Sequence, residues 1–303
     1  MSSNTKIANR DATNAESSTP TTTLLQGDCI ELMSKQSEKS VDLIFADPPY
    51  FLSNGGMTCK SGKMVSVNKG DWDASRGVSN NHAFNREWLA QCQRLLSDNG
   101  SMFVSGTFHV IFSVGFAMQE LGFKILNDIS WHKVNPPPNL SCRYFTHSTE
   151  TIIWAAKNKS SKHCFNYADM KLENDGKQMK NLWNIMAPRK AEKLLGKHPT
   201  QKPIKLLKRI VSAASQPGDM VLDPFLGSGT TGVACRELGR HFVGMDLDSA
   251  YIELAKKRIS AVDDLATTAK EIAVSKGSKR PTRTITTAQK SKRTKSTRSK
   301  SAA

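Results

Sequence analysis

The sequence predicts an α/β fold, in which a doubly wound sheet carries helices on both of its faces. Short runs rich in aliphatic and β-branched residues alternate along the chain with longer runs that have helical spacing. This alternation is typical of doubly wound sheets, whereas separate blocks of strands and helices indicate other classes. The chain has 303 residues and no internal repeat, which is enough for one large domain or two modest ones.

Strands are predicted where four to eight such residues lie between turn residues, and helices where apolar residues recur every three or four positions. The expected strands are Thr23 to Gly27, Val41 to Ala46, Ser101 to Ser105, Ile125 to Trp131, Thr151 to Ala156, Met220 to Leu222 and His241 to Met245. The expected helices are Phe84 to Leu96, His109 to Leu121, Ile204 to Ala214, Thr231 to Leu238 and Ala250 to Ile259. Residues 51–83 and 132–189 fit neither period, apart from the strand inside the second range, and loops of that length are usually functional.

The two ends of the chain differ in composition from the rest. Residues 1–23 are rich in Ser, Thr, Asn and Ala, and residues 276–303 are rich in Lys, Arg, Ser and Thr, so we expect both to be disordered. This leaves residues 24–260 as the folded domain. The net charge is +16, and the last 28 residues contribute 10 basic and no acidic side chains. Such a basic surplus favours a polyanionic partner, most simply nucleic acid.

Several classes of protein are disfavoured. No stretch approaches the ~18 uninterrupted apolar residues of a membrane span, and the first residues contain no apolar signal core, so a cytoplasmic protein without membrane contact is expected. The six cysteines form no CxxC-type pair, which disfavours a zinc or redox centre, and we expect no metal.

The tetrapeptide Asp47-Pro48-Pro49-Tyr50 follows the strand that ends at Ala46. Ligands of open α/β sheets bind beyond the carboxyl ends of the strands, which places this turn where chemistry occurs. The prolines stiffen the turn and lack N–H groups, so the Asp47 carboxylate and the Pro48 carbonyl can accept two hydrogens from an exocyclic amine while Tyr50 stacks on its ring. The alternative interpretation is an ordinary exit from a strand, where Asp and Pro are common.

A second motif begins at Asp223 and continues Pro-Phe-Leu-Gly-Ser-Gly-Thr-Thr, between a strand and a helix. Gly227 and Gly229 allow positive φ and close backbone approach, but the pattern is neither the dinucleotide GxGxxG nor a phosphate-binding P-loop. Asp246 ends the next strand, at the position where an acid binds a ribose diol. A cofactor with ribose but no pyrophosphate fits this pattern better than NAD, although a tight strand-to-helix turn alone explains the glycines.

These two motifs and the intervening Gly196-Lys-His-Pro-Thr-Gln-Lys-Pro203 occur in the order of the amino-DNA methyltransferases that use S-adenosylmethionine, in the permuted arrangement called the β class. The resemblance covers about residues 24–260 and is closest to the second adenine methylase of DpnII-type restriction–modification systems. It implies the Rossmann-like fold of these enzymes, with a small inserted target-recognition region.

The resemblance also implies roles for individual residues. It assigns the catalytic turn to Asp47, Pro48, Pro49 and Tyr50. It assigns cofactor binding to Asp28, Cys29, His198, Thr200, Lys202, Asp223, Phe225, Gly227, Ser228, Gly229, Thr230 and Asp246. Within that set, Asp28 would contact the cofactor's adenine, and Lys202 suits the methionine carboxylate because it carries a compact positive charge.

An aspartate at the first position of the catalytic motif is typical of adenine N6 enzymes, whereas serine is typical of cytosine N4 enzymes, so Asp47 favours adenine. No cysteine follows a proline, which disfavours cytosine C5 methylation. A cytosine N4 methyltransferase and a non-catalytic DNA-binding protein stay open as alternatives. By resemblance we expect methylation at GATC, a cognate restriction endonuclease and a homodimer.

The expected DNA contacts lie outside the two motifs. Residues 132–197 carry 12 basic and 5 acidic side chains interleaved with aromatic ones, which suits a target-recognition region on double-stranded or single-stranded DNA. Asn139 and Arg143 are the candidate base contacts. Residues 51–83 are expected to form a mobile loop that closes over base and cofactor, and residues 276–303 to add non-specific DNA affinity or simply solubility.

Overall fold

A computed structural model describes residues 20–53, 57–60, 63–66, 73–136 and 138–277. The expected disordered ends therefore lie almost entirely outside the described residues, as do three short pieces of the expected mobile loop. The chain divides into two compact units, Met1–Asp263 and Asp264–Ala303, and all of the description below concerns the first.

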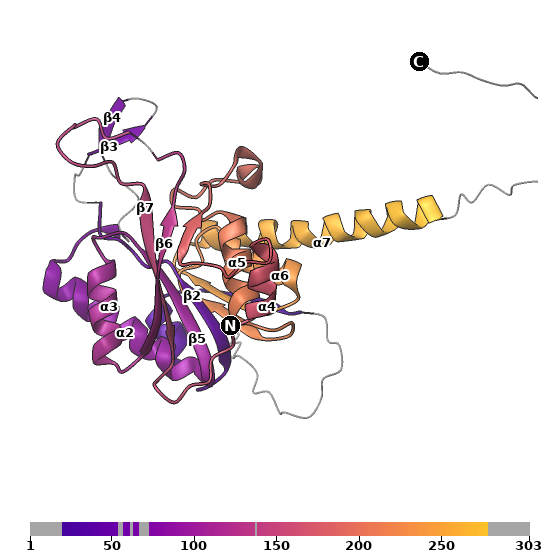
Figure 1. The fold of residues 1–303 in the computed structure, drawn as a ribbon, viewed down its shortest axis with the longest axis horizontal. Helices are drawn as coiled ribbons and strands as arrows, with labels where there is room; N and C mark the ends of the chain where they lie inside the picture. Colours follow the sequence, from indigo (N-terminus) through magenta and orange to yellow (C-terminus); the bar gives the residue numbers. More distant parts are fainter. Residues whose placement is uncertain (1–19, 54–56, 61–62, 67–72, 137, 278–303) are drawn as a thin grey trace, which may run out of the picture. The chain divides into compact units, whose positions relative to one another are not determined.

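The first unit is built on an eight-stranded sheet in the order β1-β10-β9-β2-β5-β7-β6-β8 (Figure 1). Its strands are β1 (Thr22–Gln26), β2 (Val41–Ala46), β5 (Leu96–Gly106), β6 (Lys124–His132), β7 (Thr149–Ala156), β8 (Leu182–Asn184), β9 (Met220–Asp223) and β10 (His241–Asp246). Neighbouring strands are parallel except that β7 runs antiparallel to both β5 and β6. The amino end of β7 therefore meets the carboxyl ends of its neighbours.

Helices cover both faces of this sheet, as predicted. On one side lie α1 (Cys29–Ser34), α2 (Val78–Leu95) and α3 (Ile111–Glu120). On the other lie α5 (Ile204–Ala214), α6 (Thr230–Leu238) and the start of α7 (Ser249–Gly277), with α4 (Tyr167–Glu173) against α5. The 3₁₀ turn η2 spans Lys190–Lys193.

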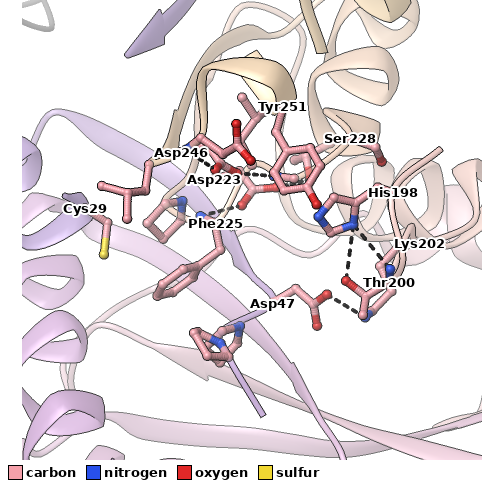
Figure 2. Close-up of a pocket in the computed structure, with 18 of the residues that line it drawn as sticks. Cys29, Asp47, His198, Thr200, Lys202, Asp223, Phe225, Ser228, Asp246 and Tyr251 are labelled. Carbon is pink, nitrogen blue, oxygen red and sulfur yellow. Dashed lines mark hydrogen bonds and ion pairs between the residues drawn. The ribbon is translucent and has the colours of Figure 1, made fainter. Parts of the chain in front are cut away.

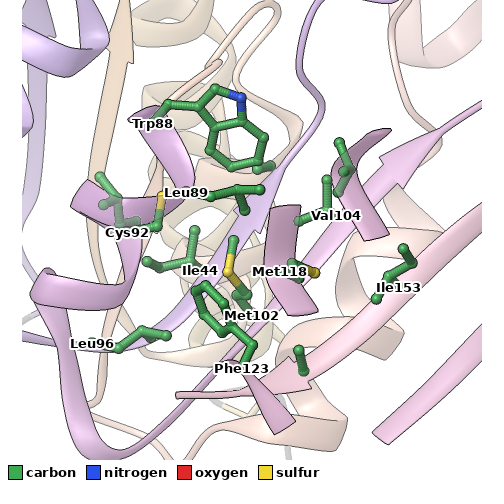
Figure 3. Packing of buried hydrophobic residues seen from close by; sticks show 14 of the residues in the cluster. Ile44, Trp88, Leu89, Cys92, Leu96, Met102, Val104, Met118, Phe123 and Ile153 are labelled. Atoms are coloured by element: carbon green, nitrogen blue, oxygen red, sulfur yellow. The ribbon is translucent and has the colours of Figure 1, made fainter. Parts of the chain in front are cut away.

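The two faces of the sheet form two hydrophobic cores because successive side chains of a strand point to opposite sides. In β2, Ile44 and Ala46 pack under α1, α2 and α3, whereas Leu43 and Phe45 pack against α5 and α6. Figure 3 shows the first core, where Trp88, Leu89 and Cys92 of α2 lie over Ile44 and Met102. Both faces of the central strands are apolar, which is why they read as continuous hydrophobic runs.

The seven predicted strands are confirmed, and α5 has the predicted bounds. Six strands shift by no more than two residues at an end, but β5 begins at Leu96, five residues before its predicted start and at the residue predicted to end the preceding helix. Helix α7 continues to Gly277, well beyond the predicted end at Ile259. The range 51–83 is not free of regular structure, which corrects the expectation. It contains the antiparallel pair β3 (Met57–Lys60) and β4 (Lys63–Ser66), and α2 begins at Val78. The first turn of α2 is Val-Ser-Asn-Asn with no capping side chain, so local propensity alone does not reveal it.

Three other short elements were not predicted: α1, α4 and β8. Each has three to seven residues, too few for a hydrophobic period to stand out. Among the described residues, no helix combines the length and apolar character needed to cross a membrane.

Helix α6 is flanked by two glycines in the left-handed region, Gly229 at φ 72° and Gly239 at φ 74°. A Cβ on Gly229 would lie 2.5 Å from the Cβ and 2.9 Å from the Cα of Ala255 in α7, whereas a Cβ on Gly239 would meet nothing within 4 Å. The two positions therefore share the same backbone strain but differ in packing.

We expect Gly239→Ala to lower the free energy of unfolding by about 1–2 kcal/mol, the cost of a left-handed alanine. Gly229→Ala should cost at least about 2 kcal/mol more, because α7 must also move. Urea denaturation of the unliganded protein measures both values, and equal losses in the two variants would contradict the packing role of Gly229.

Candidate active site

A cleft of about 530 Å³ opens where β1, β2, β9 and β10 end. Fifteen of the sixteen predicted catalytic and cofactor residues line it, and Figure 2 shows several of them around the cavity. The fifteen are Asp28, Cys29, Asp47, Pro48, Pro49, Tyr50, His198, Thr200, Lys202, Asp223, Phe225, Gly227, Ser228, Thr230 and Asp246. The turn after β2 and the loop after β9 thus face one space, although about 175 residues separate them.

The Asp47 carboxylate is the centre of a hydrogen-bond network. Its Oδ1 accepts from the Tyr50 hydroxyl at 2.7 Å. Its Oδ2 accepts from the Lys202 ammonium at 2.6 Å (Figure 2). The Lys202 side chain is almost completely buried. Burial alone would lower the pKa of Lys202, but Asp47 and Glu150 raise it above its usual value, so the ammonium is charged at neutral pH.

Glu150, the second residue of β7, lies on the other side of this network. Its carboxylate forms ion pairs with Lys133 and, at 3.5 Å, with Lys202, and it accepts from the Tyr50 hydroxyl at 3.4 Å. Burial alone would raise the pKa of Glu150, but Lys202 and Lys133 hold it at about 2. Burial, then Asp47 and Glu150, raise the pKa of Tyr50 well above its usual value, so its hydroxyl stays a neutral donor.

The backbone of the turn is hydrogen-bonded to the carboxylate of Asp73, which is fully buried. Its carboxylate accepts from the backbone N–H of Tyr50 at 2.9 Å, from the N–H of Leu52 at 3.1 Å and from the hydroxyl of Ser53 at 3.0 Å. Two prolines remove donors from this turn, so the remaining N–H groups need an acceptor. Asp73 supplies it and fixes the orientation in which Asp47 and Tyr50 leave the strand.

In the loop after β9, two carboxylates bind the backbone. Asp246 accepts from the N–H of Gly227 at 2.8 Å, and Asp223 accepts from the N–H of Phe225 at 3.0 Å and the hydroxyl of Thr231 at 2.5 Å. Burial is the main reason why the pKa of Asp223 is raised to about 7, and burial likewise raises the pKa of Asp246. Both groups are thus poised to respond to a positive charge in the cleft.

Three further predicted residues complete the rim. Asp28 caps α1, because its Oδ1 accepts from the N–H groups of Ile30 and Glu31 at 2.9 and 3.1 Å. Cys29 is buried beside it, and burial raises the pKa of its thiol to about 12. His198 packs edge-on against Tyr251 with ring centroids 4.3 Å apart, and its Nδ1 lies 3.2 Å from the Thr200 hydroxyl.

Three predicted residues do not line the cleft: Gly229, Asn139 and Arg143. Gly229 packs against α7 instead. The Asn139 side chain donates to the carbonyl of Tyr144 at 2.7 Å and accepts from the N–H and hydroxyl of Ser141, so it braces its own loop. Arg143 is exposed on that loop, outside the cleft.

Sequence reasoning missed Asp73, Lys133 and Glu150. Asp73 lies in a segment with no hydrophobic period, so nothing marked it as buried. Glu150 precedes a recognisable strand, but its place beside Tyr50 depends on β7 being antiparallel, which the residues do not reveal. Arg76, Phe84 and Tyr251 also line the cleft and were not among the predicted site residues.

Two loop features test whether a nucleoside-type cofactor fits here. Gly227 has φ 49°, and a Cβ on it would lie 3.2 Å from the His198 ring, so glycine keeps this wall of the cleft open. Both oxygens of Asp246 already accept a backbone N–H, from Gly227 and from Asp248, which leaves about two acceptor positions for a diol. The residues present therefore fit such a group.

Comparison with known proteins agrees with this geometry. The N6/N4 methyltransferase family, described as DNA methylase, matches residues 41–257. The chain is 53% identical over 242 residues to the type II methyltransferase M2.DpnII of Streptococcus pneumoniae, covering 80% of this chain and 90% of that protein. It is 54% identical over 238 residues to M2.LlaDCHI of Lactococcus lactis subsp. cremoris, covering 78% and 88%.

Among solved structures, the M1.HpyAVI–SAM complex matches with a TM-score of 0.59 and 30% identity, covering 78% of this chain and 98% of that one. This likeness confirms the fold of S-adenosylmethionine-dependent DNA methyltransferases that the motif order implied. The cleft, the motifs and the relatives lead to one assignment. The protein is a DNA methyltransferase and belongs to the N6/N4 DNA methylase family.

Proposed function

We propose that this protein transfers a methyl group from S-adenosylmethionine to the exocyclic N6 of adenine at a short DNA site, with GATC as the expected sequence. The observation that carries the proposal is that the Asp47-Pro48-Pro49-Tyr50 turn and the Gly227–Asp246 pair line the same cleft. The choice of adenine rests on Asp47, and the choice of GATC on the high identity to M2.DpnII and M2.LlaDCHI.

In the proposed complex, the target amine donates two hydrogen bonds to the turn. The Asp47 carboxylate has about four acceptor positions, of which Tyr50 and Lys202 use two, so it can take one hydrogen of the amine. The Pro48 carbonyl, which lines the cleft and has no competing N–H beside it, takes the other. Two in-plane acceptors favour a more tetrahedral nitrogen, whose lone pair is then less delocalised and more nucleophilic.

The residues that would hold the cofactor are those of the loop after β9 and of the 198–202 segment. Asp246 offers acceptors for a ribose diol, Gly227 leaves room for it, and Asp28 and Cys29 lie at the end expected for the adenine. When bound, S-adenosylmethionine supplies an electrophilic methyl group on a sulfonium centre. Thr200 and His198 flank Lys202, whose charge suits a carboxylate.

Lys202 connects the two halves of this scheme. In the structure its ammonium is shared between Asp47 and Glu150, at 2.6 and 3.5 Å. A bound carboxylate would compete with Asp47 for the Lys202 ammonium. If Asp47 lost this contact, one more of its acceptor positions would be available to the target amine. Glu150 and Lys133 then keep the pocket close to neutral, because Glu150 stays ionised above a pKa of about 2.

On the DNA side, we propose residues 24–260 as the catalytic domain, with residues 132–197 as its target-recognition region and Asn139 and Arg143 as candidate base contacts. Residues 51–83 would close over the base, and the basic tail 276–303 would add salt-sensitive affinity. The name type II methyltransferase on both relatives supports a role in a cytoplasmic restriction–modification system with a cognate endonuclease, and we propose a homodimer on the resemblance alone.

The direct test is methyl transfer from labelled S-adenosylmethionine to adenine-unmethylated DNA, followed by chromatography of the nucleosides. We expect label in N6-methyladenine, and a loss of about 10³-fold in Asp47→Asn, because the amide cannot accept in the same way and faces Lys202 without a charge. Asp98→Asn, an exposed carboxylate paired with Lys39, is the matched control and should keep full activity. Label in N4-methylcytosine would overturn the choice of base, and no label on any DNA would favour a non-catalytic binder.

Asp223 makes cofactor affinity depend on pH. A cationic ligand favours the ionised form of a carboxylate, so binding releases a proton and tightens as pH rises toward the pKa of about 7. We expect the Kd for S-adenosylmethionine to fall by several-fold from pH 5.5 to pH 7, below the range where its α-amino group titrates at about 7.7–8.0. Asp223→Asn should bind more weakly and with a shallower pH profile over this window, because Asp246 still responds to the ligand's charge. Isothermal calorimetry without DNA measures both, and parallel profiles would contradict the role of Asp223.

Glu150→Gln tests the shared lysine. The amide keeps the shape but removes the charge, so Lys202 is held by Asp47 alone and Lys133 loses its partner. We expect kcat to fall by about 10- to 100-fold, as for a small misplacement of catalytic groups, while KM for DNA changes little. Glu237→Gln, which breaks the Lys208 pair between α6 and α5, is the matched control and should leave kcat unchanged. A Glu150→Gln enzyme with normal kcat would mean that the pair only stabilises the fold.

A further inference from the structure

A cluster of exposed aromatic side chains lies outside the cleft and has no role in the scheme above. Its members are Phe108, in the connection from β5 to α3, and Tyr144, Phe145 and His147, in the connection from β6 to β7, which projects beyond the sheet (Figure 1). Phe108, Tyr144 and Phe145 are 49%, 61% and 96% exposed. We call these four residues the aromatic cluster.

Ring contacts hold the two connections together. The Phe108 ring stacks on His147 with centroids 4.8 Å apart, and Tyr144 packs on the other side of His147 at 5.6 Å. Phe145 projects from this base almost fully exposed. A contiguous group of exposed aromatic side chains, unlike a single one, is typical of an interaction surface.

The chain connects the cluster to two residues that contact Tyr50 of the Asp47–Tyr50 turn. Ser105 and Glu150 both contact the Tyr50 hydroxyl, at 3.3 and 3.4 Å. Phe108 follows Ser105 by three residues and Phe145 precedes Glu150 by five, which limits the separations along the chain to about 11 and 18 Å. The chain therefore keeps both connections of the aromatic cluster within these distances of residues that contact the Tyr50 hydroxyl.

The loop that carries Phe145 is braced rather than loosely attached. Asn139 bonds the carbonyl of Tyr144 and the N–H and hydroxyl of Ser141, and the N–H of Lys133 donates to the carbonyl of Ser148 at 2.7 Å. A ring presented on a braced loop loses little conformational entropy when it is buried by a partner.

The charge around the cluster matches nucleic acid. Residues 133–149 contain Lys133 and Arg143 and no acidic side chain, and Arg143 is exposed beside Tyr144. A protein partner would be an alternative occupant for an apolar patch, but an aromatic surface with an exposed arginine and no acidic side chain in the same connection is the composition that stacks bases and holds phosphates.

We propose that the aromatic cluster is a base-stacking surface for the DNA duplex and that Phe145 inserts into the space left when the target base leaves the stack. The proposal rests on the proposed function, because an amine inside a duplex is reached only by extruding its base. Phe145 occupies the vacated position as an apolar wedge, as inserted side chains do in other DNA complexes, and Phe108, Tyr144 and His147 support the neighbouring base. Phe145 is thus a positioning residue for the reaction.

The insertion should matter in proportion to how firmly the target is paired. We compare kcat/KM of the wild type, Phe145→Ala and Phe145→Trp on three substrates: a matched duplex, the same duplex with a mismatch opposite the target adenine, and the single strand. For Phe145→Ala we expect a loss of about 10- to 100-fold on the matched duplex, the value of one lost stacking contact. The loss should shrink on the mismatched duplex and on the single strand, and Phe145→Trp should keep activity.

A second readout follows the base itself. With 2-aminopurine at the target position, the wild type should raise the fluorescence of the matched duplex and Phe145→Ala should not, whereas both should raise that of the mismatched duplex. Phe112→Ala, which removes a 76% exposed phenylalanine on α3 outside residues 132–197, is the matched control and should behave as the wild type throughout.

The outcomes separate the inference from the proposed function. An equal loss on all three substrates would make Phe145 an ordinary DNA contact and overturn the insertion, and so would no loss on any. If Phe145→Ala kept full activity on all three substrates but lost binding to another protein, the cluster would be assigned to a protein partner. A wild type that methylates none of the three substrates would overturn the proposed function itself.

Discussion

The buried ion pair between Lys202 and Asp47 is the contact on which the site depends. It joins the turn after β2 to a segment 155 residues later, and it brings a positive charge to the Asp47 carboxylate. A buried pair of this kind is tolerable only when its remaining hydrogen-bonding capacity is used. Tyr50 donates to Asp47, and Glu150 pairs with both Lys202 and Lys133, so four charged side chains and one phenol form one connected network.

This network explains why the turn Asp47–Tyr50 is held in one conformation although it lies in a loop. Lys202 and Tyr50 orient the Asp47 carboxylate. The Asp73 carboxylate accepts from the backbone N–H groups of Tyr50 and Leu52. The two prolines contribute stiffness but remove hydrogen bonds, and Asp73 accepts the N–H groups that are left. The conformation of the motif is therefore held by residues outside it.

The prediction from residues was strongest where the physics is local. The strand that ends at Ala46 and the helix Ile204–Ala214 are long, periodic and bounded by clear turn residues, and both were placed at their true bounds. The first turn of α2, the strands β3 and β4, and the short α1, α4 and β8 were missed, because their stability comes from neighbours rather than from their own periodicity.

For the site, motif order was enough to name fifteen of the residues that line the cleft, since Asp47, Gly227 and Asp246 are marked by their identity and by their place after a strand. Contacts between residues of different strands and connections could not be predicted from the sequence. Three contacts depend on long-range packing. Glu150 lies beside Tyr50 because β7 is antiparallel, and Lys202 pairs with Asp47 from a distant segment. Phe108 and His147 likewise join two separate connections. Local sequence records which groups are available, whereas distances between groups far apart in the chain arise only when the sheet assembles.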